Sequence, residues 1–158
     1  MTAPTNKWRI CPLEPSDRAF ILSLIPRLSA FGLPLERDPR TLHALMTEEF
    51  KNLPSKLETA LELIAEDQNG VSVGFIQCER EHDPFSGVAR SYVQMLAVAE
   101  DAEGQGVGRA LLERATLWAR ETGLEGLSLH VFATNARARA FYAKMGFIED
   151  TVRLVKPD

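Results

Sequence analysis

The chain has 158 residues, of which 45% are hydrophobic and 25% charged, a composition typical of one soluble globular domain with a sizeable core. Lys and Arg number 18 against 22 Asp and Glu, so the formal net charge is −4, which does not favour a nucleic-acid-binding protein. Cys11 and Cys78 are far apart in the sequence and lack the paired spacing of a zinc site, so we expect two reduced thiols and no metal.

No window approaches the ~18 apolar residues of a membrane-spanning helix, and the N-terminus lacks the apolar run of a signal peptide. We therefore expect residues 1–158 to form a single cytoplasmic domain with no membrane contact. A single disulfide stays open as the less favoured alternative to two free thiols.

The first half of the chain alternates short periodic segments with turns. Residues 7–13, KWRICPL, are predicted to form a first strand, and a helix should begin at Ser16 or Asp17, because apolar residues recur at helical spacing after them. Pro26 is expected to kink or end that helix. The turn-rich segment 29–39, SAFGLPLERDP, carries more apolar side chains than a plain connector usually does.

A second helix is predicted with Asp38 as its N-cap and Pro39 in its first turn. The residues expected on its buried face are Leu42, Leu45, Met46 and Phe50.

From Leu61 onward the hydrophobic period is that of strands. LELIAED (61–67) and VSVGFIQCER (71–80) flank Gln-Asn-Gly, and Asn-Gly is the strongest short hairpin signal. After a second turn, 81–87, a third antiparallel strand is predicted over 89–98.

The last third alternates helices and strands. A helix is predicted from Val107 to about Glu121, a strand over 124–132, a helix over 135–145 and a last strand over 147–156. The order β-α-α-β-β-β-α-β-α-β predicts an α/β (α+β) fold in which a single mixed, mostly antiparallel sheet is flanked by helices on both faces.

The stretch EDAEGQGVGRALLERA, residues 100–115, places three glycines at the start of a helix, where glycine is unfavourable. Bare backbone there presents unpaired amides beside the positive end of the helix dipole, which suits a phosphate or pyrophosphate. Three glycines in five positions exceed the needs of a tight turn, so we favour phosphate binding over a purely structural role. The P-loop pattern is absent, and Leu111 stands where the dinucleotide fingerprint needs its third glycine.

The sequence resembles the GNAT superfamily of acetyl-CoA-dependent N-acyltransferases. LAVAEDAEGQGVGRALL supplies the family's strand end and glycine motif through Leu96, Val98, Gly106 and Gly108. HVFATNARARAFYAKMGF has its second motif, with Asn135, Tyr142, Gly146 and Phe147 in the family's order and spacing. The N-terminal half matches only in the order of its elements.

The resemblance implies that an acetyl group passes from acetyl-CoA to a primary amine of a small molecule or peptide by direct attack on the thioester. It also implies that Tyr142 acts as a general acid toward the leaving thiolate and that Asn135 bonds the cofactor. An amide near Leu96 or Ala97 would polarise the thioester carbonyl. The residues implied in holding the pyrophosphate by their amides are Gly104, Gln105, Gly106, Val107, Gly108, Arg109 and Ala110. Those implied in pairing with the pantetheine arm are Leu96, Ala97 and Val98.

Two positions depart from the family pattern. Glu103 replaces the Arg or Gln that opens the glycine motif, so its side chain is expected to turn to solvent, and an arginine is expected to offset its charge. The arginines considered for this are Arg109, Arg137 and Arg139. Gln94 stands where many relatives carry a glutamate, so a direct carboxylate base at that position is absent. The remaining candidate bases are Glu79, Glu81, His82, His130 and an ordered water relay, although a structural histidine and a solvated hairpin end are the favoured interpretations of 130 and 79–82.

The acceptor is expected to meet three segments: the loop 29–39, the hairpin 82–85 and the last strand. Phe31, Leu33 and Leu35 would make the entrance partly apolar, whereas Glu36, Asp38 and Glu48 either attract a cationic amine or are plain surface charge. The main alternative function is a non-catalytic or sensory acyl-CoA-binding domain. A more distant one is a domain with a purely structural glycine turn that binds another protein through the Phe31 loop. Exposed strand edges leave a homodimer open.

Overall fold

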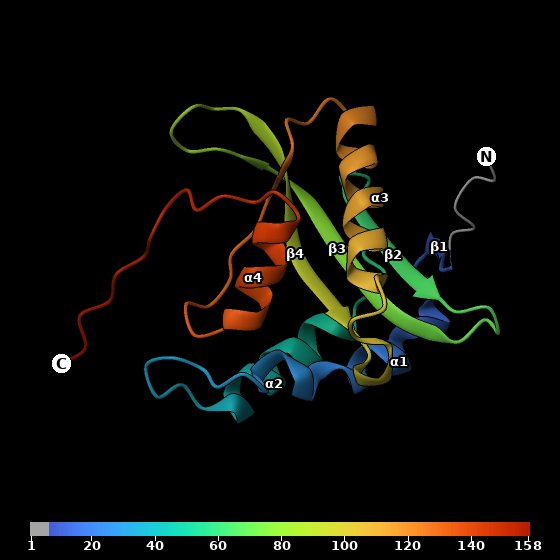
Figure 1. The fold of residues 1–158 in the computed structure, drawn as a ribbon, viewed down its shortest axis with the longest axis horizontal. Coiled ribbons are helices and arrows are strands. Elements are labelled where there is room, and N and C mark those ends of the chain that lie inside the picture. The colour runs from blue at the N-terminus through green and yellow to red at the C-terminus, as the bar shows by residue number, and fades with distance from the viewer. Residues whose placement is uncertain (1–6) are drawn as a thin grey trace.

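The computed structural model describes residues 7–158 as a five-stranded sheet with helices on both of its faces (Figure 1). Residues 1–6, and with them part of the expectation about a leader, lie outside the described residues. The helices and strands are, in chain order, β1 (Arg9–Pro12), η1 (Pro15–Asp17), α1 (Arg18–Ser23), η2 (Ile25–Ser29), α2 (Pro39–Phe50), β2 (Ala60–Glu66), β3 (Ser72–His82), β4 (Ala89–Val98), η3 (Glu100–Ala102), α3 (Val107–Glu121), β5 (Leu127–Ser128) and α4 (Ala136–Lys144).

The strands lie in the order β1-β2-β3-β4-β5. Neighbours from β1 to β4 are antiparallel, and β5 pairs parallel to β4, so the mixed, mostly antiparallel sheet is confirmed. The hairpin at 68–70 is confirmed as well. The Asp67 carboxylate accepts bonds from the amides of Asn69 and Val71 at 2.8 and 2.9 Å, and Gly70 has a φ of +78°.

The two faces of the sheet carry separate apolar cores. Because side chains alternate along a strand, Leu61 and Leu63 of β2 face α3, whereas Ile64 faces α1 and α2. Leu111, on the buried stripe of α3, and Phe50, at the end of α2, are both fully buried. The rings of Phe50 and Phe75 meet edge-on at 5.5 Å. Helices therefore cover both faces, as predicted.

The helices of the first half differ in detail from the expectation. Pro26 ends the first one as predicted: α1 stops at Ser23 and the chain continues as the 3-10 helix η2. Asp38 caps α2 by accepting a bond from the amide of Arg40 at 2.9 Å. The expected burial of Leu45 is wrong, because this side chain is 61% exposed. The inward face of α2 follows the spacing i, i+4 and i+8 through 42, 46 and 50, and residue 45 falls outside it.

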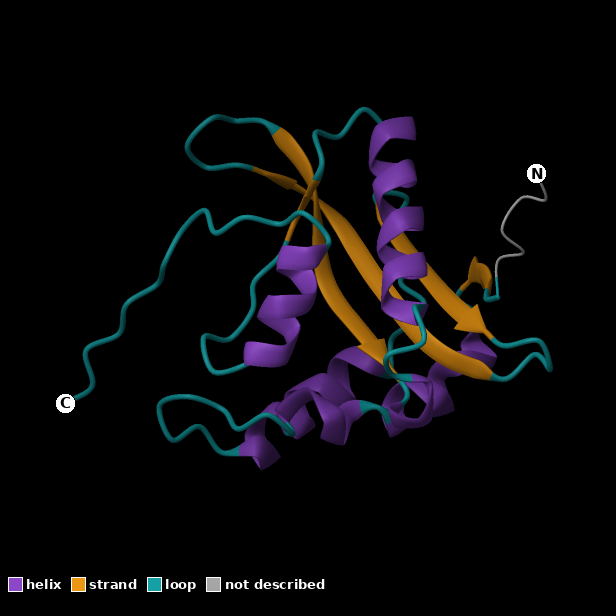
Figure 2. Cartoon of the chain, viewed as in Figure 1, coloured by secondary structure: helices purple, strands orange, loops and turns teal. Residues whose placement is uncertain are grey.

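The expected last strand over 147–156 is wrong, and the strand expected over 124–132 is much shorter. β5 contains only Leu127 and Ser128, and the chain after α4 runs away from the sheet as an irregular segment (Figure 2). Ile148 and Leu154 are each 89% exposed. A strand needs a neighbouring backbone as well as an alternating pattern, and the short β5 does not supply one of sufficient length.

A bulge in β4 opens the sheet where the site lies. The register of β3 with β4 passes from Cys78–Val93 to Gln77–Met95, so Gln94 is an extra residue in β4. β5 pairs with β4 only at Ser91 and Tyr92, before the bulge. The end of β4 beyond the bulge therefore lies outside the ladder with β5.

Candidate functional site

The turn before α3 contains glycines at which any other residue would introduce backbone strain or a steric contact. Gly104 and Gly106 have φ values of +71° and +91°, a region that side chains with a Cβ rarely adopt, and Gly106 is the N-cap of α3. A Cβ at Gly104 would meet nothing within 4 Å, so the backbone faces open space. Gly108 differs: its Cβ would lie 3.2 Å from Cζ of Phe141, so this glycine lets α3 approach α4 closely.

The first helical bond of α3 defines which amides are available to a ligand. The amide of Ala110 donates to the carbonyl of Gly106 at 3.0 Å, so Ala110 is committed to the helix. The amides of Val107, Gly108 and Arg109 precede that bond and point out of the helix N-terminus, where the helix dipole adds positive potential. The arrangement suits an anion. We call the main-chain amides of residues 104–109 the amide cradle. Ala110, which was also predicted to contribute its amide, is left out because that amide is bonded within the helix.

The side chains of two residues of this turn, Gln105 and Arg109, bond other parts of the protein. Gln105 bonds Lys7 at 3.0 Å and the carbonyl of Asp101 at 2.9 Å, and its own carbonyl accepts from Nε1 of Trp8 at 3.3 Å. Arg109 lies on the surface of α3 and pairs with Glu113 at 2.9 Å. These two residues can therefore contribute backbone amides to a phosphate, but their side chains are engaged elsewhere.

The edge of β4 past the bulge lies outside the ladder with β5. The amide of Ala99 donates to the carbonyl of Val73 at 2.8 Å, so the neighbouring residue Val98 directs its carbonyl to the opposite side, away from β3. Leu96 has the same orientation by alternation, and Ala97 is turned toward β3. The main-chain groups of Leu96 and the amide of Val98 are thus placed to pair with an extended ligand, whereas the carbonyl of Val98 already accepts from Nε of Arg27.

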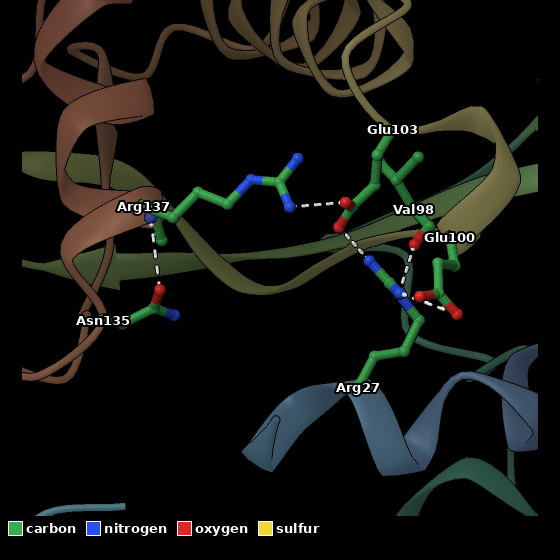
Figure 3. Close-up of polar contacts among 7 residues, drawn as sticks. Arg27, Val98, Glu100, Glu103, Asn135 and Arg137 are labelled. Atoms are coloured by element: carbon green, nitrogen blue, oxygen red, sulfur yellow. Dashed lines mark hydrogen bonds and ion pairs between the residues drawn. The ribbon is translucent and has the colours of Figure 1, made fainter. Parts of the chain in front are cut away.

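A cluster of charged side chains joins the turn before α3 to the end of β4. The two oxygens of the Glu103 carboxylate are held by two arginines, Arg27 from η2 and Arg137 from the first turn of α4 (Figure 3). Nε of Arg27 also donates to the carbonyl of Val98 at 2.8 Å. The expectation that Glu103 turns to solvent is wrong: its side chain is 27% exposed and points inward.

Sequence reasoning named Arg137 as one of three arginines that could offset the charge of Glu103, and it missed Arg27. Arg27 is 76 positions from Glu103 and belongs to no motif, so only the fold brings the two together. The two other arginines considered have different partners: Arg109 pairs with Glu113 and Arg139 with Glu149.

Asn135 and Tyr142 both belong to α4. Asn135 is the N-cap of this helix, and its Oδ1 accepts from the amide of Ala138 at 3.2 Å, which leaves its NH₂ group for a ligand. The ring of Tyr142 contacts those of Phe141 and Phe147 at centroid distances of 5.3 and 5.4 Å. Burial raises the pKa of Tyr142 to about 12, so its hydroxyl keeps its proton at neutral pH and can donate it.

The candidate bases separate into two groups. Glu79 accepts from Nε2 of Gln94 at 2.9 Å, directly at the bulge, and Oε1 of Gln94 is buried with no partner among the described residues. Nδ1 of His130 lies 3.0 Å from the hydroxyl of Tyr92, the residue paired with Glu79 across the ladder. The side chains of Glu79, Tyr92 and Gln94 therefore lie close together on the sheet beside the bulge.

The other two candidates lie toward the hairpin. Glu81 accepts from the hydroxyl of Ser128 at 3.1 Å, and His82 is exposed at the end of β3. The 82–85 hairpin is solvated at its tip, where Phe85 is 84% exposed. This position fits the interpretation of a solvated hairpin end better than that of a base.

The loop 29–39 packs against the segment that follows β5. Phe31 lies 5.7 Å from the ring of Phe132, and the hydroxyl of Thr134 donates to the carbonyl of Gly32 at 2.9 Å. Leu35 and Glu36 adopt φ values of +61° and +51°, which costs ~1–2 kcal/mol for each L residue. The loop thus has a defined shape, and the segment after β5 anchors it.

No helix in residues 7–158 combines the length and the apolar character that crossing a bilayer requires. Cys11 and Cys78 are both free thiols, as expected. Burial raises the pKa of Cys78 to about 12, which makes this thiol unreactive at neutral pH.

Comparison with known proteins agrees with this geometry. The sequence model of the acetyltransferase (GNAT) family matches residues 30–147. A mycothiol acetyltransferase from Propionibacterium freudenreichii is 40% identical over 85 residues, which are 54% of this chain and 27% of that protein. A ribosomal protein bS18-alanine N-acetyltransferase from Escherichia coli is 45% identical over 58 residues, 37% of this chain and 39% of that protein. The chain therefore spans less than half the length of these two relatives.

A solved structure shows the same fold. The aminoglycoside antibiotic 6′-N-acetyltransferase from Acinetobacter baumannii superposes with a TM-score of 0.71 at 16% identity, covering 96% of this chain and 98% of that one.

Proposed function

Because the chain belongs to the GNAT acetyltransferase family, we propose that it transfers an acetyl group from acetyl-CoA to a primary amine. The observation that carries the proposal is the combination of three features on the segments that hold the family motifs. These are the outward amides of residues 104–109, the edge of β4 at Leu96 and Val98 that lies outside the ladder with β5, and the protonated hydroxyl of Tyr142 on α4.

The residues present fit a phosphate-bearing cosubstrate. Gly104 and Gly106 adopt positive φ values, and no atom stands within 4 Å of the position that a Cβ of Gly104 would take. Phosphate oxygens can therefore approach the amides closely. When bound, acetyl-CoA supplies the thioester acyl group and the thiolate that leaves. The β4 edge would pair with its pantetheine arm as an added strand.

Tyr142 is the proposed general acid. Its hydroxyl holds a proton across the neutral range because burial disfavours the phenolate. A proton or hydrogen bond donated to the leaving sulfur lowers the barrier to breaking the C–S bond. Asn135, the N-cap of the same helix, is proposed to bond the cosubstrate through its free NH₂ group.

Glu79 is the base that the geometry supports best. An aliphatic amine with a pKa of ~10.4 must lose a proton before it attacks. Gln94 cannot accept that proton, but it holds Glu79 at 2.9 Å beside the bulge. Glu79 would take the proton directly or through an ordered water, and His130 is the second candidate, through its contact with Tyr92.

The acceptor is proposed to enter past the loop 29–39, whose Phe31 packs on Phe132. Either a small-molecule amine or a peptide amine fits this proposal, since the two relatives above are named for mycothiol and for an alanine of a ribosomal protein. An assay of thiol release from acetyl-CoA against a panel of amines tests the function. Turnover with one class of amine supports it. CoA binding without turnover on any amine would instead favour the sensory acyl-CoA-binding alternative.

We also propose that two copies of the chain associate. The segment 147–156 has the alternating pattern of a strand, yet Ile148, Val152 and Leu154 are 73–89% exposed. The short β5 borders the sheet. Pairing of these segments between two copies would bury the exposed apolar side chains.

A further inference from the structure

Glu103, Arg27 and Arg137 come from three separate parts of the chain, and their side chains meet directly before the glycine turn proposed to bind the cosubstrate. We call this set the Glu103 bridge (Figure 3). Glu103 directly precedes the amide cradle, and Arg27 bonds the carbonyl of Val98 on the open edge of β4. The bridge therefore spans the two main-chain surfaces that the proposed function assigns to the cosubstrate.

The two arginines differ in how firmly they are held. Arg27 is 26% exposed and has further contacts with the carbonyl of Val98 at 2.8 Å and with Glu100 at 3.9 Å. Arg137 is 72% exposed, and its recorded side-chain partner is Glu103. An exposed pair of this kind exchanges partners readily, because water and salt screen it.

The bridge has more positive than negative charge. One carboxylate faces two guanidinium groups, so the cluster retains one unit of net positive charge before Glu100 is counted. Guanidinium groups bind carboxylate and phosphate in the same bidentate manner. A phosphate group that reached Arg137 would therefore replace the carboxylate on the same donors, and it would leave Glu103 paired with Arg27.

We propose that Glu103 is a built-in competitor for a phosphate group of the cosubstrate. In the free protein its carboxylate occupies Arg137. On binding, Arg137 passes from Glu103 to a phosphate, while Arg27 keeps Glu103 and limits its repulsion of the bound anion. Arg137 is thus a phosphate-binding residue, and Glu103 sets how tightly the cosubstrate binds. The inference rests on the proposed function.

A double-mutant cycle measured by calorimetry tests this exchange. Glu103→Gln should tighten CoA binding by about threefold to tenfold, because Arg137 no longer has to leave a carboxylate. Arg137→Gln should weaken it by about tenfold. In the Arg137→Gln background, Glu103→Gln should change the affinity by less than about twofold, since no donor remains to be released.

Matched controls separate the exchange from a change in net charge. Glu149→Gln removes a carboxylate that pairs with Arg139 of α4 instead of Arg137. Arg120→Gln removes an exposed charge in the last turn of α3. Both should leave the CoA affinity unchanged. Melting temperatures of all variants report whether each one folds.

Truncated ligands identify the phosphate concerned. If the Glu103→Gln effect is lost with dephospho-CoA, Arg137 binds the 3′-phosphate; if it persists, Arg137 binds the diphosphate. Pantetheine, which has no phosphate, should show no effect, and an effect there would overturn the proposal. Equal tightening in both backgrounds would mean that Glu103 acts by repulsion alone and would also overturn it. Absence of CoA binding in folded wild-type protein would refute the proposed function itself and this inference with it, whereas normal wild-type binding with no tightening would refute only the inference.

Discussion

The ring of Tyr142 packs between Phe141 and Phe147, while its hydroxyl, whose pKa burial raises to about 12, keeps its proton at neutral pH. Packing and the proposed proton donation thus involve different atoms of one side chain. A substitution that removes only the hydroxyl separates the two roles.

Tyr142→Phe is expected to lower kcat by roughly 10²- to 10⁴-fold and to leave the Kd for CoA nearly unchanged, because the ring stays in place. Thiol release measures kcat, and calorimetry measures Kd. Unchanged turnover would remove Tyr142 from the mechanism.

The same variant tests the raised pKa. The folded-state pKa of about 12 lies above the ordinary tyrosine value of 10.0, so folding favours the protonated phenol. The wild type should therefore lose stability as the pH rises from 10 toward 12, whereas Tyr142→Phe should lose less over that interval. Urea unfolding at a series of alkaline pH values measures the difference.

Glu79→Gln removes the proposed base and keeps a side chain of the same shape beside Gln94. We expect the rate with a saturating amine to fall about 10²-fold at pH 7. The deficit should shrink as the pH approaches ~10, because the neutral fraction of an amine with a pKa of ~10.4 rises about tenfold per pH unit. A pH–rate profile checks this. His130→Gln is the comparison, and the same profile in that variant alone would transfer the role to His130.

Some residues of the candidate site could be predicted from sequence motifs, and others could not. Gly104, Gly106, Asn135 and Tyr142 occur at family spacings, and they lie at the start of α3 and on or next to α4. Their roles toward a ligand stay predictions. Arg27 was not predictable, because its contact with Glu103 joins residues 76 positions apart and depends on how η2 lies against the end of β4.

At the scale of elements, the turn into α3 joins a strand edge to a helix N-terminus. Gly106→Val should abolish CoA binding, because a β-branched residue disfavours the φ of +91° and its side chain would cover the amides. Gly123→Val is the matched control: Gly123 has a φ of +76° just beyond the other end of α3 and open space around it. Both variants should lose stability, and only the first should lose affinity in calorimetry. CoA affinity retained by folded Gly106→Val would refute the amide cradle.

The structure confirms those predicted elements whose ends carry strong local sequence signals. Pro26 ends α1, Asp38 caps α2, and Asn-Gly turns β2 into β3. β4 was predicted with its correct bounds, but its bulge was not, since one extra residue at Gln94 leaves the hydrophobic pattern readable as a plain strand. The bulge is nevertheless the feature that lies next to Glu79 and opens the edge.

At the scale of the whole molecule, the segment after α4 leaves the apolar side chains of Ile148, Val152 and Leu154 exposed to solvent. If two copies pair through it, light scattering should give a mass twice 17.6 kDa, and a chain ending at Phe147 should give a single copy's mass. Phe147 is kept because it packs on Tyr142. A full-length protein that stays monomeric at high concentration would contradict the proposal.

The sequence by itself determined the family resemblance, the order of elements up to α4, and the two main-chain motifs, because caps, turns, glycine clusters and periodicity act over a few residues. Only the tertiary structure decided what the motifs face. It turned Glu103 inward onto Arg27 and Arg137, placed Glu79 beside the bulge, shortened β5 to two residues and left residues 147–158 off the sheet. These outcomes depend on contacts between distant segments, whose energies no local pattern contains.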